Sequence, residues 1–317
     1  MSAAVVVAPR QLEIREVQLP EPGPGEVRVR VEGCGVCASN LPPWEGRPWF
    51  EYPLPPGSLG HEAWGWIDAV GPGLTDRRVG ERVASLSTNA YAEYTTCSSK
   101  ATIVLPASLD GQPFPGEPLA CAMNVFERSE IRRGRHVAIV GIGFLGALLT
   151  RLAVSAGAQV IAISRRPCAL ELARRLGARE TLALESASEV IRRVRDITGD
   201  ALCERVIEAA GHQATLELAG ELAGERSRLI IAGYHQDGLR QVNMQLWNWR
   251  GLDVINAHER DPQRYRDGVQ LAIDAVTSGL LDPLGLYTHR FRLNELDKAF
   301  EMVSQRPMGF FKALIVT

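Results

Sequence analysis

Hydrophobic and polar positions follow two different patterns along the chain. Up to about Leu119, short apolar runs typical of β-strands are separated by segments dense in glycine and proline. Clear examples are the runs at residues 26–31, 63–70 and 102–105. This pattern predicts a small, barrel-like all-β domain whose long loops carry side chains outward.

From Arg135 onward, apolar strands alternate with helical segments. We expect strands at 136–140, 159–163, 204–209 and 228–232, with helices beginning near residues 144, 167 and 213. Such alternation is typical of a parallel, doubly wound α/β sheet. The tail from Leu286 to Thr317 returns to short strands, so we expect it to fold back onto the first domain.

Length and charge limit the possible function classes. A chain of 317 residues exceeds the roughly 100 to 200 residues of one domain. We therefore expect a first domain at 1–119, completed by 258–317, and a dinucleotide-binding domain at 120–257. The formal net charge is only -2, so neither nucleic acid nor a membrane surface is expected as a partner.

Two apolar stretches could be mistaken for targeting or membrane segments. The run from Ala3 to Ala8 is short and ends at Pro9, so it predicts a first strand and not a signal peptide. The stretch from His136 to Thr150 is shorter than the ~20 residues that cross a bilayer. We expect a cytoplasmic protein, whose six irregularly spaced cysteines are reduced core residues or metal ligands.

A glycine-rich segment, VAIVGIGFLG at residues 137–146, joins an apolar strand to an apolar helix. Backbone amides at the helix start can hold a pyrophosphate, Gly143 permits its close approach, and Gly146 lets helix and strand pack tightly. The alternative is a tight turn that serves packing alone. We expect cofactor contacts from this loop and from the ends of the later strands, namely Gly141, Gly143, Phe144, Leu145, Gly146, Ser164, Arg165, Arg166, Ala209 and Gly233.

The residues after the second strand of this region favour NADP(H) over NAD(H). An NAD-binding protein usually offers an acidic residue to the ribose hydroxyls at this point. Here Ser164 is followed by Arg165 and Arg166, and two guanidinium groups suit a 2′-phosphate far better than a carboxylate would. The alternative is that both arginines lie at a solvated helix start.

Cys37 and His61 are the first candidates for a metal site. Thiolate and imidazole suit zinc, and a catalytic zinc needs three protein ligands and one open position. Glu117 and Cys121 compete for the third place. Each residue also has a structural alternative, as a buried thiol, a loop histidine or a carboxylate at a helix start. Cys34 is assigned to the core, because no second cysteine pair exists.

Several aromatic and polar residues have two open interpretations. Trp44, Trp49 and Phe50 follow the metal-binding cysteine and either wall a pocket for a sugar or cyclic polyol or anchor the loop on the core. Four later residues either reach the site or serve as surface or interdomain contacts: Trp247, Trp249, His258 and Glu259.

The chain resembles a known family of proteins over essentially its whole length. Zinc-containing medium-chain alcohol dehydrogenases, above all their sorbitol and polyol dehydrogenase branch, are similar to it in five motifs: GCGVCASN, GHEAWGWIDAVGPG, EPLA, GIGFLG and VIEAAG. The resemblance implies a GroES-like β-barrel catalytic domain and a Rossmann domain, with zinc on Cys37, His61 and Glu117. It also implies that Glu62 approaches the metal as an outer or exchanging ligand, and that the chain forms a homodimer or homotetramer.

Three departures from the family pattern matter. The chain after Val83 has no four-cysteine lobe, so we expect one catalytic zinc per chain and no structural zinc. Asn40 replaces the aspartate that commonly supports the zinc-bound histidine, and we expect its amide to accept a hydrogen bond from His61. Pro42 occupies a position where a proton-relay histidine often lies, while Ser39 remains.

The resemblance implies hydride transfer between NADP(H) and a secondary alcohol or ketone, with a polyol or sugar as the leading substrate class. Zinc would polarise the substrate oxygen, Ser39 would pass the hydroxyl proton toward the cofactor ribose, and Glu62 would act beside the metal. Two alternatives are a zinc-free, NADPH-dependent reductase of enones or quinones and a non-catalytic NADPH-binding sensor. Metal content distinguishes the three.

Overall fold

The computed structural model describes every residue from Met1 to Thr317, and the chain divides into two compact units. Unit 1 consists of residues 1–120 and 261–317, and unit 2 consists of residues 121–260. No helix of the chain combines the length and the hydropathy that a membrane span requires.

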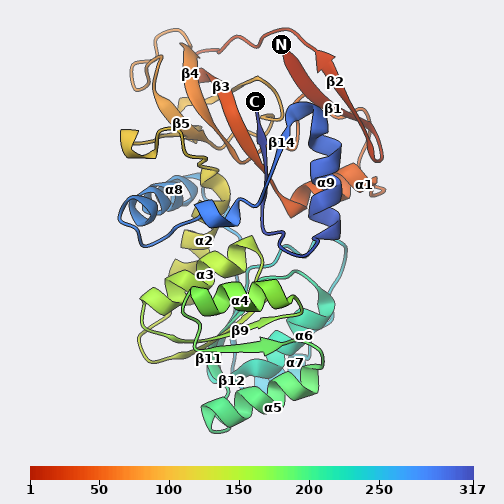
Figure 1. The fold of residues 1–317 in the computed structure, drawn as a ribbon, viewed down its shortest axis with the longest axis vertical. Coiled ribbons are helices and arrows are strands. Elements are labelled where there is room, and N and C mark those ends of the chain that lie inside the picture. Colours follow the sequence, from red (N-terminus) through yellow and green to blue (C-terminus); the bar gives the residue numbers. More distant parts are fainter. The chain divides into compact units, whose positions relative to one another are not determined.

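Unit 1 is built on a mostly antiparallel sheet that joins distant parts of the chain. Its strand order is β14-β15-β3-β4-β5-β7, β6 also pairs with β3, and β1 and β2 form a separate two-stranded sheet. The strands are β1 Ser2–Ala8, β2 Gln11–Glu16, β3 Glu26–Val36, β4 Ala63–Val70, β5 Arg82–Ser85, β6 Tyr94–Ser98, β7 Thr102–Val104, β14 His289–Arg292 and β15 Ala313–Val316. Because β15 pairs with β3, the C-terminal tail does fold back onto the first domain (Figure 1).

Alternating side chains explain why β3 occupies the centre of this sheet. Val27, Val29 and Val31 are buried while the residues between them are not, as expected when successive side chains point to opposite faces. The helices of unit 1 are α1 Leu41–Glu45, α8 Pro262–Thr277 and α9 Leu296–Gln305, and α2 Gly116–Ser129 begins in unit 1 and continues into unit 2. Trp44 of α1 is 1% exposed and its ring centroid lies 5.6 Å from that of Phe300, so this tryptophan is a core residue and not a pocket wall.

Unit 2 is a six-stranded sheet of order β10-β9-β8-β11-β12-β13 in which every neighbouring pair is parallel. The strands are β8 His136–Val140, β9 Gln159–Ser164, β10 Glu180–Ala183, β11 Cys203–Glu208, β12 Ala223–Ile231 and β13 Asp253–Asn256. The helices are α3 Phe144–Ser155, α4 Pro167–Arg175, α5 Ala187–Thr198, α6 Gln213–Leu222 and α7 Met244–Trp249. The doubly wound α/β sheet predicted from the sequence is confirmed.

The order of the strands in unit 2 indicates where a ligand binds. Successive strands run outward from β8 to β10, and the chain then crosses back to place β11 on the other side of β8. Figure 1 shows α3 and α4 on one side of the strands and α5 on the other. In open parallel sheets, ligands bind at the carboxyl ends of the strands where the order reverses, and Gly141 directly follows β8 at that point.

One strand begins earlier than predicted. β12 starts at Ala223, whereas the apolar pattern predicts a start at residue 228. Exposed Glu225 and Arg226 lie in its first half, and Arg226 has a φ of 52°. The apolar pattern misses this half because Glu225 and Arg226 face solvent.

Candidate functional site

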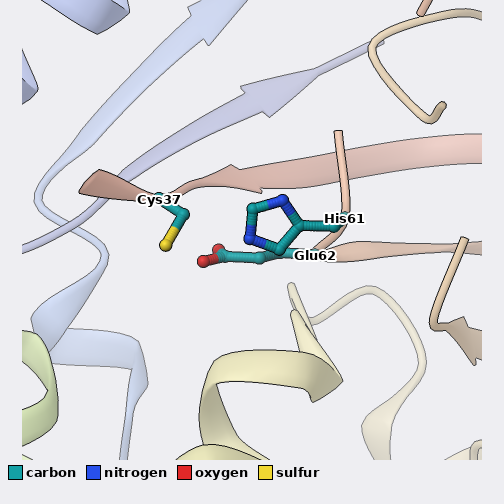
Figure 2. Close-up of side chains that lie close together, drawn as sticks. All are labelled: Cys37, His61 and Glu62. Carbon is teal, nitrogen blue, oxygen red and sulfur yellow. The ribbon is translucent and has the colours of Figure 1, made fainter. Parts of the chain in front are cut away.

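Three potential metal ligands converge in unit 1. Figure 2 shows the Cys37 sulfur, one ring nitrogen of His61 and the Glu62 carboxylate pointing toward one another, and their ligand atoms all lie within 4.8 Å. Cys37 directly follows β3, and Glu62 directly precedes β4. Since these strands are hydrogen-bonded neighbours, with Cys34 opposite Ala63, the sheet register itself brings the ligands together.

A glycine in β3 makes room for the carboxylate of Glu62. A Cβ atom at Gly35 would lie 1.8 Å from Glu62 Oε2, and the Gly35 N–H donates to the Glu62 carbonyl at 3.0 Å. Any side chain at this position would displace the carboxylate. Gly35 therefore fixes both the backbone and the side chain of Glu62.

The His61 ring is oriented by a backbone carbonyl. Its Nδ1 lies 2.8 Å from the Leu59 oxygen, which leaves Nε2 to face Cys37 and a metal. Asn40 Nδ2 donates to the same oxygen at 3.0 Å. The expectation that Asn40 accepts a hydrogen bond from His61 is therefore wrong, because Leu59 places its own carbonyl at the ring nitrogen.

Lys312 lies beside the ligands and is not among the residues predicted from the sequence. Its Nζ donates to Glu62 Oε1 at 2.6 Å and lies 2.5 Å from Oε2, and both side chains are buried. A single charge directly before the apolar run 313–316 is the signal that could have indicated a buried ion pair. The register of β15 with β3 brings Lys312 to this point.

The electrostatics of this pocket favour a cation. Burial by itself lowers the pKa of His61, but the hydrogen bond and charge of Cys37, together with Glu117 and Glu62, raise that pKa to about 10. Burial likewise opposes the charge of Lys312, yet Glu62 and Cys37 raise its pKa above the ordinary value. A pocket that stabilises two cations against burial, with sulfur, nitrogen and oxygen donors, fits a zinc ion.

Glu117 lies in the first turn of α2, outside the convergent group. Its Oε1 accepts a hydrogen bond of 2.7 Å from the hydroxyl of Tyr265 on α8. Cys121, one turn further along α2, is half-buried and is also outside the group. The assignment of Glu117 as third ligand stays a prediction, and Tyr265 is a polar neighbour that no local sequence signal identifies.

The remaining predicted residues of unit 1 lie around this pocket or in the core. Ser39 is half-buried in the short 3-10 helix Ala38–Asn40, and Pro42 is buried in α1. Cys34 is fully buried in the core, as assigned, and burial raises the pKa of its thiol. Trp49 is 61% exposed with its ring 6.1 Å from that of Phe50.

The glycine loop of unit 2 has the shape expected of a dinucleotide loop. A Cβ atom at Gly146 would lie 2.0 Å from the Gly141 carbonyl oxygen, so only glycine allows α3 to pack this closely. A Cβ atom at Gly143 would have nothing within 4 Å. Gly146 thus serves packing, and Gly143 leaves open space at the start of α3, where Phe144 and Leu145 form the first turn.

The two arginines after β9 behave differently. Arg166 is partly buried and donates to the Ile142 carbonyl of the glycine loop at 3.1 Å, and burial lowers the pKa of its guanidinium. The Arg166 N–H also donates to Ser164 Oγ at 3.2 Å. Arg165 is exposed. One guanidinium therefore supports the loop while the other faces solvent.

Glu208 organises the neighbouring strand ends. It is fully buried and accepts hydrogen bonds from the N–H groups of Ala210 and Gly211 at 2.9 and 2.8 Å. A Cβ atom at Gly233 would lie 2.4 Å from Glu208 Oε2. Gly233, predicted to contact cofactor, thus packs against this carboxylate, whereas Ala209, also predicted to contact cofactor, donates its N–H to the Val140 carbonyl. Glu208 is not among the residues predicted from the sequence.

Among the later candidates, Trp247 packs in the core of unit 2 and Trp249 is 85% exposed. His258 is exposed, with its ring 6.1 Å from that of Tyr234, and Glu259 is half-buried. Trp249 and His258 are therefore surface residues of unit 2, and whether they reach the site stays a prediction.

Two family models match this chain. Residues 23–108 match the alcohol dehydrogenase GroES-like domain, and residues 145–274 match the zinc-binding dehydrogenase domain. The first match covers Cys37 and His61, and the second covers the helix of the glycine loop and both arginines.

Curated relatives and solved structures extend this similarity to the whole chain. Galactitol 1-phosphate 5-dehydrogenase of Escherichia coli K12 is 31% identical over 67% of this chain and 69% of its own length. The alcohol dehydrogenase rspB of Escherichia coli CFT073, complexed with NADH, superposes with a TM-score of 0.87 at 25% identity over 100% of this chain and 99% of that one. A zinc-binding dehydrogenase of Sinorhizobium meliloti 1021, bound to NADP, gives a TM-score of 0.85 at 27% identity over 100% and 99%.

Proposed function

This chain belongs to the zinc-type medium-chain alcohol dehydrogenase family, and we propose that it transfers hydride between NADP(H) and a secondary alcohol or ketone of a polyol or sugar. The observation that carries the proposal is the convergence of the Cys37, His61 and Glu62 ligand atoms within 4.8 Å in a pocket that stabilises cations. When bound, zinc supplies a Lewis acid that polarises the substrate oxygen.

The residues of the chain then have separate tasks. Cys37 and His61 hold the metal, and the Leu59 carbonyl keeps the imidazole in one orientation. Lys312 compensates the charge of Glu62. Ser39, in the turn after Cys37, takes up the proton of the substrate hydroxyl on its Oγ and passes it toward the cofactor ribose.

Glu117 is our proposed third zinc ligand, and Glu62 is an outer carboxylate. The hydrogen bond from Tyr265 to Glu117 Oε1 supports this, because it orients the carboxylate, and the charge of Glu117 acts on His61. Lys312 contacts both oxygens of Glu62 and competes with a metal for them. The competing assignment exchanges the roles of the two carboxylates.

Matched glutamine variants decide between the two carboxylates. We expect Glu117→Gln to lose tightly bound zinc and Glu62→Gln to retain about one zinc per chain, measured by elemental analysis after dialysis against a chelator. Retention of zinc in Glu117→Gln with its loss in Glu62→Gln would assign the third ligand to Glu62 instead.

Preference for NADP(H) rests on Arg165 and Arg166. Exposed Arg165 is free to meet a 2′-phosphate, and Arg166 braces the glycine loop through Ile142. Because a hydrogen bond to a charged group contributes about 1.5–3 kcal/mol, Arg165→Ala is expected to lower the NADP to NAD ratio of kcat/KM by roughly tenfold or more. An unchanged ratio in both arginine variants contradicts the argument.

The substrate class is tested by a screen. Purified protein with its metal content measured is offered polyols, sugars, simple alcohols and, in the reverse direction, enones with NADPH. We expect one zinc per chain and oxidation of a polyol or sugar, followed at the nicotinamide absorbance. Protein that holds no zinc and reduces enones with NADPH would instead be a zinc-free reductase.

Self-association as a homodimer or homotetramer is also part of the proposal. The edge strand β13 of unit 2 follows α7 in the chain, and exposed apolar side chains lie on and before α7, including Met244 at 61% and Trp249 at 85% exposure. Exposed apolar groups of this size beside an unpaired strand edge are typical of an interaction surface. Light scattering coupled to gel filtration measures the mass, and a strict monomer would contradict this part.

A further inference from the structure

Asn40 connects the segments that carry the two firmest zinc ligands. Its side chain is 2% exposed. Its Oδ1 accepts the Cys37 backbone N–H at 3.2 Å, and its Nδ2 donates to the Leu59 carbonyl at 3.0 Å. The same carbonyl lies 2.8 Å from His61 Nδ1. One amide therefore links the backbone of Cys37 to the group that orients His61.

The Leu59 carbonyl reaches this position through an unusual backbone conformation. Leu59 has a φ of 73°, in the left-handed region that residues with a Cβ rarely adopt. The next residue, Gly60, packs directly on the 90–91 backbone, where a Cβ atom would lie 2.3 Å from the Tyr91 nitrogen. Surrounding contacts must hold a residue in such a conformation, and the Asn40 amide is one of them.

A buried tyrosine fixes the direction of the Asn40 amide. The Tyr91 hydroxyl donates to Asn40 Oδ1 at 2.8 Å and lies 3.2 Å from the Gly35 carbonyl. Two donors, the Tyr91 hydroxyl and the Cys37 N–H, thus face the amide oxygen, so the NH2 group must face Leu59. The chain of contacts runs from Tyr91 through Asn40 and Leu59 to the His61 ring.

From this arrangement we infer that Asn40 is a positioning residue for zinc, acting on His61 through the Leu59 carbonyl. The inference rests on the proposed function. An amide is required because the position needs both an acceptor, for Cys37, and a donor, for Leu59. An aspartate accepts but cannot donate when ionised, and its charge would face the carbonyl that orients His61. The aspartate typical of related proteins would therefore weaken zinc binding in this chain.

Zinc affinity, measured by competition with a chromophoric chelator, tests the inference without reference to turnover. We expect Asn40→Asp to weaken zinc binding by about 10- to 100-fold, the range found when outer partners of metal ligands are changed. Tyr91→Phe should cause a smaller loss in the same direction, because Asn40 keeps its other two hydrogen bonds. Leu59→Gly, which keeps the carbonyl and suits a positive φ, should retain wild-type affinity.

Asn89→Asp is the matched control, since it makes the same substitution at an exposed position of the neighbouring segment, and its affinity should not change. Thermal unfolding of the zinc-free proteins shows that each variant is folded, and visible spectra after cobalt(II) substitution report the ligand arrangement. The inference is overturned if Asn40→Asp binds zinc as tightly as wild type or more tightly. If Asn40→Asp does not fold, an unchanged zinc affinity in Tyr91→Phe overturns it. A wild-type chain that binds no zinc contradicts the proposed function itself.

Discussion

The candidate zinc pocket of unit 1 and the dinucleotide loop of unit 2 differ in how the chain builds them. The pocket combines Cys37 directly after β3, His61 in the turn before β4 and Lys312 directly before β15. The loop between β8 and α3 is one continuous segment, Gly141 to Gly146. The pocket is held by side-chain hydrogen bonds and a buried ion pair, whereas the loop depends on its glycines and on one hydrogen bond from Arg166.

This difference has an energetic consequence. In the pocket, Glu62 and Lys312 compensate each other's charge away from solvent, so a change in one leaves the other unpaired. In the loop, the two glycines have different surroundings: a Cβ atom at Gly143 would meet open space, whereas one at Gly146 would meet the Gly141 carbonyl. Substitutions in the pocket should therefore affect one another, whereas those in the loop should act separately.

Cys37→Ala should have the largest effect. It removes the sulfur ligand, and we expect loss of tightly bound zinc and of measurable turnover, while NADP binding to unit 2 is unchanged. Elemental analysis and a fluorescence titration with NADPH measure the two properties on the same sample. Loss of NADPH binding together with zinc would show that the two regions are not independent.

Lys312→Met tests the buried ion pair. Leaving Glu62 charged and unpaired should lower the free energy of unfolding by about 3–5 kcal/mol, measured by urea denaturation of the zinc-free protein. The double variant Glu62→Gln with Lys312→Met should lose less than Lys312→Met alone, because no charge is left unpaired.

Lys298→Met is the control for this experiment, since Lys298 forms an exposed ion pair with Glu295 and its loss should change stability little. A Lys312→Met variant as stable as this control would mean that water reaches Glu62. The pocket would then not depend on a buried ion pair, and its substitutions would not be expected to affect one another more than those in the glycine loop.

Alanine at two glycines of the loop should have the smallest but most selective effects. Gly146→Ala places a Cβ atom against the Gly141 carbonyl and should cost about 1–3 kcal/mol in stability. Gly143→Ala meets no atom of the chain, so its thermal unfolding should match wild type, yet its affinity for NADPH should fall because the new methyl group lies where a pyrophosphate approaches. Zinc content should stay constant in both variants, and equal NADPH affinity for Gly143→Ala and wild type would remove Gly143 from the cofactor site.

Much of the fold could be predicted from apolar patterns, because the buried side of each helix or strand carries apolar residues at a regular spacing. The predicted strand at 136–140 agrees with β8, and the helix predicted to begin near residue 213 agrees with α6. The start of β12 was missed because exposed Glu225 and Arg226 carry no apolar pattern. For the site, Cys37 and His61 could be predicted as zinc ligands from the sequence, because few residue types bind zinc.

The sequence by itself determined the parallel sheet, the glycine loop and two candidate zinc ligands, because these depend on local periodicity and on residue chemistry. Only the tertiary structure decided their surroundings. Lys312 reaches Glu62 through the pairing of β15 with β3, and Tyr265 reaches Glu117 from α8. The hydrogen-bond partner of His61 is the Leu59 backbone carbonyl and not the Asn40 side chain. The sequence does not predict this partner, because every residue has a backbone carbonyl and its direction depends on φ and ψ.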